Sequence, residues 1–293
     1  MDIRTLGYVR FGVADVDGWA TFFRDVVGAM VSADPSTGAA HVRLDDHQSR
    51  IRFERHETTR LLAAGWELAS PDALVRAGDE LAAAGVTVDE LGPDECRRLL
   101  VEAALRCSDP SGNVLELYHS PLFATDPVAL HPAVSGFVTG DMGLGHVVLP
   151  VADADETASF YTSLLGFVHR DSMLVAPPGV DPYRMRFLAC NPRHHSVALT
   201  GAQTPAGIRH LMVHMREVID VGRAFDRASR AGVLKTSIGQ HSNDLMLSFY
   251  ATGPGGIDVE VATLGERHDN ATWQARELAA FKAWGYEPPR LAT

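Results

Sequence analysis

Residues 239–260, GQHSNDLMLSFYATGPGGIDVE, contain a histidine, a tyrosine and a glutamate, which are side chains that bind metals and exchange protons. Residues 248–252 are rich in β-branched and aromatic types, residues 253–256 predict a turn, and the following IDVEVAT alternates as a second strand. A carboxylate on the inward face of such a strand, here Glu260, is costly unless another group compensates its charge. A metal ion would do so, which raises the question of further ligands.

An internal repeat supplies the elements that must position these side chains. GYVRFGVADVDGWATFFRDVVGAM at 7–30 matches GHVVLPVADADETASFYTSLLGFV at 145–168 without a gap, as an alternating strand followed by an amphipathic helix. Residues 109–121 resemble 253–265, and the helical pattern at 70–86 resembles the one around 216–233. The chain is therefore duplicated, and each half is predicted to hold two units of a strand, a helix and further strands.

The proline-containing segment 123–136 has little periodicity and separates the halves. We expect a metal-free N-terminal domain over 1–134 and a catalytic domain over 135–293. Near the end, Leu278, Phe281 and Trp284 fit one stripe of a helix that would stop at Gly285. The sequence thus predicts a C-terminal helix and tail folded back on the second domain.

The composition of the 293-residue chain argues against several classes of function. The formal net charge of −11 argues against nucleic acid or an anionic membrane as a partner. No run reaches the roughly 18 apolar residues of a membrane span, and the first residues lack the pattern of a signal peptide. The three cysteines are scattered without metal-ligand spacing, as in a reduced compartment. A cytoplasmic protein is expected.

Aligning the halves isolates candidate ligands, because eight of the thirteen histidines lie from His146 onward. The aligned pairs are His146 with Tyr8, His210 with Trp66, and Glu260 with Glu116. Two histidines and a carboxylate on rigid strands leave three positions open on an octahedral metal, which suits Fe(II) oxygen chemistry. A single buried histidine is more often a hydrogen-bonded core residue, and Glu116 shows that the glutamate can persist without a site.

These residues resemble the two-domain extradiol (type I) ring-cleaving dioxygenases of the vicinal oxygen chelate superfamily, most of all the 2,3-dihydroxybiphenyl 1,2-dioxygenases. MGLGHVVL, CNPRHHSVAL, IRHLMVHM and residues 239–260 carry the resemblance, with LGYVRF and SDPSGNVLELYH in the first half. The family's signature is met by His241, Phe249, Tyr250, Pro254, Gly256 and Glu260. Gly253 departs from it at a turn position, where a local effect on loop geometry is expected.

The resemblance implies an α+β fold of four βαβββ modules, paired into two open-barrel domains of the glyoxalase/bleomycin resistance/dihydroxybiphenyl dioxygenase type. It implies that only the second domain holds a metal, with His146, His210 and Glu260 as ligands to Fe(II), and with Mn(II) as the less favoured ion. The partners would be a catechol and O2, and the family usually forms homo-oligomers, often octamers.

The resemblance also assigns the remaining roles. His195 would be the acid and base over the metal, and His241 and Tyr250 would hydrogen-bond the catecholate. Asn243 and Asp244 would support the loop around His241. Phe187 would line the ring pocket, together with Val148 and Met173. His194 follows as a structural residue, because on a strand it would face away from His195.

Two other functions use the same fold. Glyoxalase-type isomerases and transferases use Zn, Ni or Mn, and commonly draw ligands from paired modules or subunits, whereas all the candidates here lie in one half. A metal-free binding protein that sequesters a drug or an aromatic compound would have no need for two ligand-type histidines on adjoining strands. Among catechols, biphenyl, alkyl and steroid types all remain open, because the proline-rich loop at 173–183 shapes the pocket.

Overall fold

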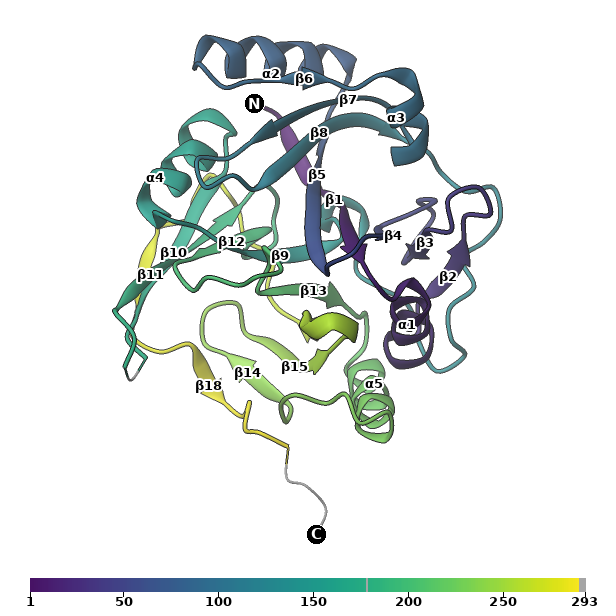
Figure 1. The fold of residues 1–293 in the computed structure, drawn as a ribbon. Helices are drawn as coiled ribbons and strands as arrows, with labels where there is room; N and C mark the ends of the chain where they lie inside the picture. Colours follow the sequence, from purple (N-terminus) through teal and green to yellow (C-terminus); the bar gives the residue numbers. More distant parts are fainter. Residues whose placement is uncertain (178, 290–293) are drawn as a thin grey trace.

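The computed structural model describes residues 1–177 and 179–289 as two twisted sheets with helices packed on them (Figure 1). The first sheet has eight strands in the order β2-β3-β4-β1-β5-β8-β7-β6. The second has ten, in the order β17-β10-β11-β12-β9-β13-β16-β15-β14-β18. Strands β1 to β8 all belong to the first sheet and β9 to β18 to the second, as a duplicated chain requires.

The first half reads as βαβββ twice, with one additional helix, α3. Its elements are β1 (Ile3–Val13), α1 (Val16–Thr21), β2 (Met30–Ala33), β3 (Ala40–Arg43), β4 (Ile51–Arg55), β5 (Arg60–Leu68), α2 (Pro71–Ala83), β6 (Asp89–Glu90), α3 (Pro93–Leu99), β7 (Val101–Ser108) and β8 (Val114–Pro121).

The second half repeats the pattern and adds two short strands at its end. Its elements are β9 (Gly145–Pro150), α4 (Ala154–Ser159), β10 (Val168–Val175), β11 (Tyr183–Ala189), β12 (Val197–Thr200), β13 (His210–His214), α5 (Val218–Arg230), β14 (Gly239–His241), β15 (Met246–Thr252), β16 (Asp258–Leu264), β17 (Arg276–Leu278) and β18 (Lys282–Trp284). The expectation of four βαβββ modules is confirmed.

The first helix of each half is built in the same way. Asp15 caps α1 by accepting a hydrogen bond from the Gly18 amide, and Asp153 caps α4 by accepting from the amides of Asp155 and Glu156. Each helix then continues as a π-helical turn, η1 (Phe22–Val27) and η3 (Phe160–Leu164). The shared cap and the shared turn show that the gapless sequence match reflects a common local structure.

The strand register corrects one pair of the alignment between the halves. Gly65 pairs with both Tyr8 and Glu116, just as Met212 pairs with both His146 and Glu260. His210 lies two residues before Met212, so its counterpart is Ala63, two residues before Gly65. The prediction that His210 matches Trp66 was wrong. An odd shift along a strand turns a side chain to the opposite face, and Trp66 indeed faces the core.

Trp66 is fully buried, with its ring centroid 5.0 Å from that of Phe167 in the other half. We expect Trp66→Ala to lower the free energy of unfolding by about 3–5 kcal/mol, because it leaves a large cavity in the core. Urea denaturation measures this loss. Metal binding by the folded protein should not change, and a variant as stable as the wild type would contradict this placement of the indole.

The predicted C-terminal helix is also wrong, because the segment forms strands at both edges of the second sheet. β17 pairs in parallel with β10, and β18 pairs antiparallel with β14. Edge strands present unpaired amide and carbonyl groups, which these short strands satisfy. Phe281 packs inward with Phe187, whereas Trp284 is half exposed, so these apolar side chains do not form one buried stripe.

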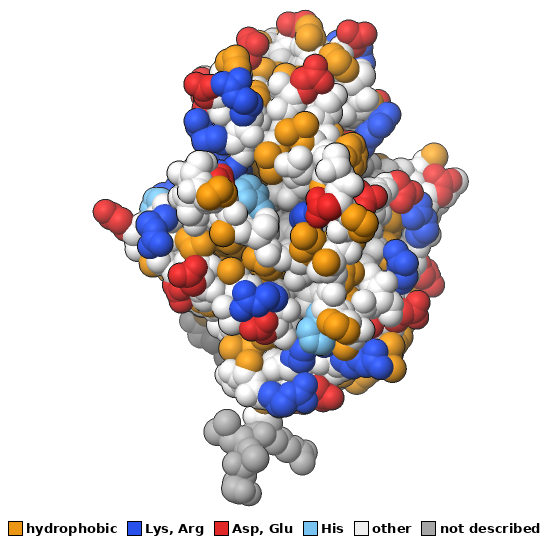
Figure 2. Space-filling view, turned by 90° about the vertical axis from the view of Figure 1, so that its right-hand side faces the viewer, with side chains coloured by type: hydrophobic (Ala, Val, Ile, Leu, Met, Phe, Trp, Pro, Cys, Tyr) orange, Lys and Arg blue, Asp and Glu red, His pale blue; other side chains and the backbone are white. Residues whose placement is uncertain are grey.

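The surface shows mixed charge on the face seen in Figure 2, where basic and acidic side chains lie among hydrophobic ones. None of the helices within residues 1–177 and 179–289 has the length and apolar character needed to cross a bilayer. The expected division of the chain at residues 134 and 135 stays a prediction.

Candidate active site

Three neighbouring strands of the second sheet bring His146, His210 and Glu260 together. His146 lies in β9, His210 in β13 and Glu260 in β16, with β13 between the other two strands. The Nε2 atoms of the histidines are 3.2 Å apart, and they lie 3.4 Å (His146) and 3.2 Å (His210) from Oε2 of Glu260. The repeat and the resemblance pointed to these three residues, and in the fold they form one cluster.

The donor set fits a cation. Glu260 is buried, yet its Oε2 atom has no hydrogen-bond partner among the described residues. Burial lowers the pKa of His146 to about 4, despite the opposing effect of Glu260, so its imidazole is neutral and can offer a lone pair. Two imidazole nitrogens and a carboxylate oxygen converging on one point match the ligands of a facial divalent metal site.

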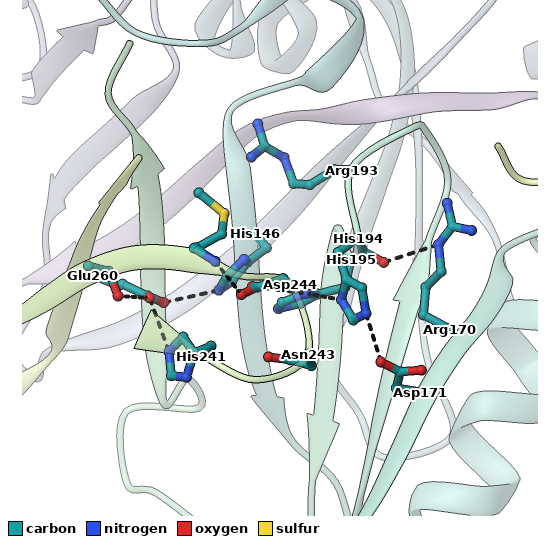
Figure 3. A network of polar contacts seen from close by, with 12 residues as sticks. His146, Arg170, Asp171, Arg193, His194, His195, His241, Asn243, Asp244 and Glu260 are labelled. Atoms are coloured by element: carbon teal, nitrogen blue, oxygen red, sulfur yellow. Dashed lines mark hydrogen bonds and ion pairs between the residues drawn. The ribbon is translucent and has the colours of Figure 1, made fainter. Parts of the chain in front are cut away.

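The second carboxylate oxygen of Glu260 is held by hydrogen bonding. Ser248 Oγ donates to Oε1 at 2.5 Å, and the Tyr286 hydroxyl lies 2.7 Å from the same Oγ (Figure 3 shows Glu260 and its neighbours). Burial opposes ionisation of Glu260, but contacts with His146, His210 and His241 outweigh it and hold its pKa well below the usual range. Ser248 and Tyr286 were not predicted, although Ser248 shares a strand face with Tyr250.

Ser248→Ala should weaken metal binding by about 10- to 100-fold, because it removes the hydroxyl that orients the Glu260 carboxylate. Competition with a chromophoric chelator measures this affinity. Thr263→Ala is a matched control, since that buried hydroxyl lies on neighbouring β16 and has no hydrogen-bond partner among the described residues. Equal affinities for the two variants would show that Ser248 does not position Glu260.

His241 and Tyr250 lie next to the cluster and contact each other. The Tyr250 hydroxyl is 3.0 Å from Nε2 of His241, while Nδ1 of His241 is 3.2 Å from the Phe281 carbonyl oxygen. The Tyr286 ring stacks on His241 with centroids 4.5 Å apart. Phe281 comes from the segment that was expected to be helical and Tyr286 from the tail after it, which is why neither was predicted here.

His195 reaches the cluster from the bend between β11 and β12. Its ring stacks on His146 with centroids 4.0 Å apart and meets the edge of Phe187 at 5.1 Å. Burial, with the neighbouring rings of His146 and His194, lowers the pKa of His195 well below 6.5. A neutral imidazole in this place can accept a proton.

His194 does not turn away from His195, in contrast to the expectation from strand alternation. The two residues lie in an irregular bend that precedes β12, so the two-residue period does not apply. Their Nδ1 atoms are 3.1 Å apart.

Asn243 and Asp244 form the loop between β14 and β15 and face the cluster. Asp244 Oδ1 accepts a hydrogen bond from the Met246 amide at 3.0 Å, which shapes the loop after His241. The Asn243 carbonyl oxygen accepts from Arg276 at 3.4 Å. Both side chains line the innermost part of the cavity together with Phe187.

The small pocket around the cluster adjoins a cavity of about 470 Å³, with which it shares His210, His241 and Tyr250. The apolar walls of the cavity include Val148 and Met173, which were predicted, and Val175, Met185 and Phe281, which were not. Charged groups occur at the rim, where Lys235 forms an ion pair with Asp258. The cavity is large enough for one aromatic ring with a sizeable substituent.

The first half carries a buried carboxylate at the equivalent place but compensates it differently. Glu116 accepts hydrogen bonds from the Tyr8 hydroxyl at 2.7 Å, from Arg10 at 2.6 Å and from Arg106 at 2.8 Å. Tyr8 stands where His146 stands, and Arg106 pairs with Glu116 as Tyr250 pairs with Glu260. Two guanidinium groups and a hydroxyl thus compensate this buried carboxylate without a metal.

Gly253, the departure from the family signature, lies against the first half. A Cβ atom there would come within 2.3 Å of the Trp19 ring, while the backbone angle of −76° suits any residue. Close packing of the two halves therefore accounts for a glycine at this turn.

Comparisons with known proteins agree with this geometry. Residues 143–261 match the family model of the glyoxalase/bleomycin resistance protein/dioxygenase superfamily, and residues 6–55 match that of dihydroxybiphenyl dioxygenase BphC D1. An iron-dependent extradiol dioxygenase of Rhodococcus jostii RHA1 is 38% identical, with 98% of each chain covered.

Two further proteins extend the similarity. The biphenyl-2,3-diol 1,2-dioxygenase of Paraburkholderia xenovorans LB400 is 36% identical over 99% of this chain and 97% of its own. The crystal structure of the 2,2',3-trihydroxybiphenyl 1,2-dioxygenase of Sphingomonas wittichii RW1 superposes with a TM-score of 0.86 at 32% identity. The superposition covers 98% of this chain and all of the Sphingomonas wittichii chain.

Proposed function

The chain belongs to the extradiol ring-cleaving dioxygenases of the glyoxalase and dioxygenase superfamily, and we propose that it uses Fe(II) to open a 3-substituted catechol such as 2,3-dihydroxybiphenyl. Both atoms of O2 would enter the product, a 2-hydroxy-6-oxo-dienoate cleaved beside the two hydroxyls. The observation that carries the proposal is the buried Glu260 oxygen facing two imidazole nitrogens in the small pocket that adjoins the cavity.

His146, His210 and Glu260 would hold the metal. A ferrous ion there supplies positive charge that makes a catechol more acidic, and a redox centre through which O2 can react with a closed-shell ring. Iron is favoured because the ligand set suits it and because the Rhodococcus jostii relative is named iron-dependent. Manganese suits the same ligands and is the second choice.

Three side chains would act on the substrate directly. His195 would take a proton from a catechol hydroxyl and return it as the ring opens, since its neutral imidazole lies beside the ligands. His241 and Tyr250 would hydrogen-bond the catecholate oxygens and stabilise the charge that develops on them. Asn243 and Asp244 would keep His241 in place through the loop that they form.

The cavity supports the choice of a 3-substituted catechol. Phe187 would contact the ring near the metal cluster, and Val148, Met173, Val175 and Met185 would surround its substituent. Apolar walls favour the binding of an apolar substituent of the size of a phenyl ring, because binding removes that substituent from water. Membership of the extradiol dioxygenases argues against the isomerase and the metal-free binding protein as alternatives.

An oxygen-uptake experiment tests the proposal. The protein is loaded anaerobically with ferrous iron and mixed with 2,3-dihydroxybiphenyl and air, while dissolved O2 and visible absorbance are recorded. We expect one O2 consumed per catechol and a yellow ring-opened product, with a higher kcat/KM for 2,3-dihydroxybiphenyl than for unsubstituted catechol. Iron-loaded protein that consumes no O2 with either diol or with 3-methylcatechol would overturn the proposed function.

A further inference from the structure

Hydrogen-bonded side chains lead from His195 through His194 to Asp171, on the side away from Glu260 (Figure 3). Nδ1 of His195 is 3.1 Å from Nδ1 of His194, and Nε2 of His194 is 2.9 Å from Oδ2 of Asp171. Arg276 then donates to Asp171 twice, from Nε at 2.9 Å and from Nη2 at 2.8 Å. His194 and Asp171 are buried, and the side chain of Arg276 is half exposed.

The hydrogen bonds between these side chains have a defined direction from donor to acceptor, because Asp171, the last acceptor, is ionised. Burial opposes ionisation of Asp171, but hydrogen bonds from His194 and Arg276 outweigh it and hold its pKa below the usual range. An ionised carboxylate only accepts, so Nε2 of His194 must carry the hydrogen between them. A neutral imidazole has one N–H group, which leaves Nδ1 of His194 as an acceptor. Nδ1 of His195 must therefore donate to it.

It follows that neutral His195 carries its proton on Nδ1 and leaves Nε2 bare. No hydrogen bond to His195 Nε2 occurs among the described residues, and the ring lines the innermost part of the cavity with the three ligands. Resting on the proposed function, we propose that His194 and Asp171 are positioning residues, which fix His195 in the tautomer whose Nε2 accepts the substrate proton.

The same hydrogen bonds also help His195 once its Nε2 atom holds the substrate proton. Nδ1 of His195 still donates to His194, and the Asp171 carboxylate beyond His194 balances the positive charge. Aspartate acts in this way on histidine in hydrolytic triads, where it sets the tautomer and balances the charge.

A second metal ion is the competing explanation, because ligating atoms of His194, His195 and Asp244 lie within 4.8 Å of one another. The Nδ1 atoms of the two histidines are at hydrogen-bond distance, whereas the nearest Asp244 oxygen is 3.9 Å from Nδ1 of His195. A shared hydrogen accounts for the short contact without an ion.

The tautomers are measured directly on the metal-free wild-type protein. A long-range ¹H–¹⁵N correlation spectrum of histidine-labelled protein, with His194→Gln for assignment, distinguishes a protonated Nδ1 from a protonated Nε2. We expect His195 as the Nδ1–H form and His194 as the Nε2–H form. The opposite tautomer at His195, or zinc titration that binds two ions and shifts both histidines, would overturn the inference.

Kinetics of the iron-loaded enzyme test what the tautomer does. Asp171→Asn should lower kcat for 2,3-dihydroxybiphenyl by about 10²-fold, the lower end of an acid–base contribution, with KM changed less than about three-fold. His194→Leu should behave similarly. His194→Gln should recover most of the rate, because its carbonyl can accept from His195 while its amide donates to Asp171. A merely structural role would not be restored in this way.

His268→Gln is the matched control, because His268 packs against His194 with ring centroids 5.6 Å apart but takes no part in the hydrogen bonds from His195 to Asp171. It should keep the wild-type rate. Asp171→Asn that folds and retains kcat within about two-fold would refute the inference even if the enzyme is active. Wild type that shows the expected tautomers but no O2 uptake would instead refute the proposed function.

Discussion

Replacing His195 with alanine is expected to lower kcat for ring cleavage by about 10²–10⁴-fold, the range that general acid–base catalysis contributes. His195 is the neutral imidazole stacked on His146. Among the described residues that line the small pocket around the cluster, it is the one histidine outside the proposed ligand set whose pKa is lowered. Stopped-flow absorbance under saturating substrate and O2 measures the loss.

The iron content of His195→Ala separates this effect from loss of the metal. His195 is outside the three-residue ligand cluster, so the variant should retain iron as the wild type does. Imidazole added to the solvent should restore part of the rate, because the substitution leaves a gap of that shape next to the cavity. Normal turnover by the variant would remove His195 from the mechanism.

Replacing Glu260 with glutamine is expected to abolish both iron retention and ring cleavage. The substitution preserves shape but removes the only anionic group among the three proposed ligands. Loss of an outer-shell partner alone typically costs about 10–100-fold in metal affinity, so loss of the charged ligand should exceed about 100-fold. Iron content after gel filtration and O2 uptake measure the two effects.

The first half contains the matched control for this change. Glu116→Gln alters the equivalent buried carboxylate, which is bonded to Arg10 and Arg106 instead of facing two histidines. It should leave iron content unchanged and lower the free energy of unfolding by about 3–5 kcal/mol, since it strips a buried charge pair of one partner. If both variants kept iron, Glu260 would not be a ligand.

Much of the site could be predicted because the internal repeat allows the two halves of the chain to be compared with each other. His146 stood out against Tyr8, whereas Glu260 has a glutamate as its counterpart in Glu116, and the strand register supports both pairs. The pairing of His210 with Trp66 failed because the loops between strands differ in length, and sequence matching alone does not fix a register across them. His210 was nevertheless singled out, as the histidine of the expected strand IRHLMVHM and by the family resemblance, and the structure places its strand between the other two.

The parts that failed depend on contacts far apart in the chain. Residues 276–284 have a helical period but meet two open sheet edges, and edge pairing decided their structure. Phe281 and Tyr286 reach the site only because the C-terminal segment pairs with the sheet edge at β14. His194 was misjudged because a local bend replaced the strand that was assumed.

The two arginines bonded to Glu116 bear on how the stability of the protein depends on iron. Its own guanidinium groups neutralise the buried charge of the first sheet, so that sheet needs no ligand to be complete. In the second sheet, the Oε2 atom of Glu260 has no hydrogen-bond partner within residues 1–177 and 179–289, and a bound metal would supply one. A ligand at about 100 times its Kd adds about 2.7 kcal/mol to the folded state. Because the two halves share one hydrophobic core, a chelator should therefore lower the melting temperature of the whole protein, although the lost contact lies in the second sheet.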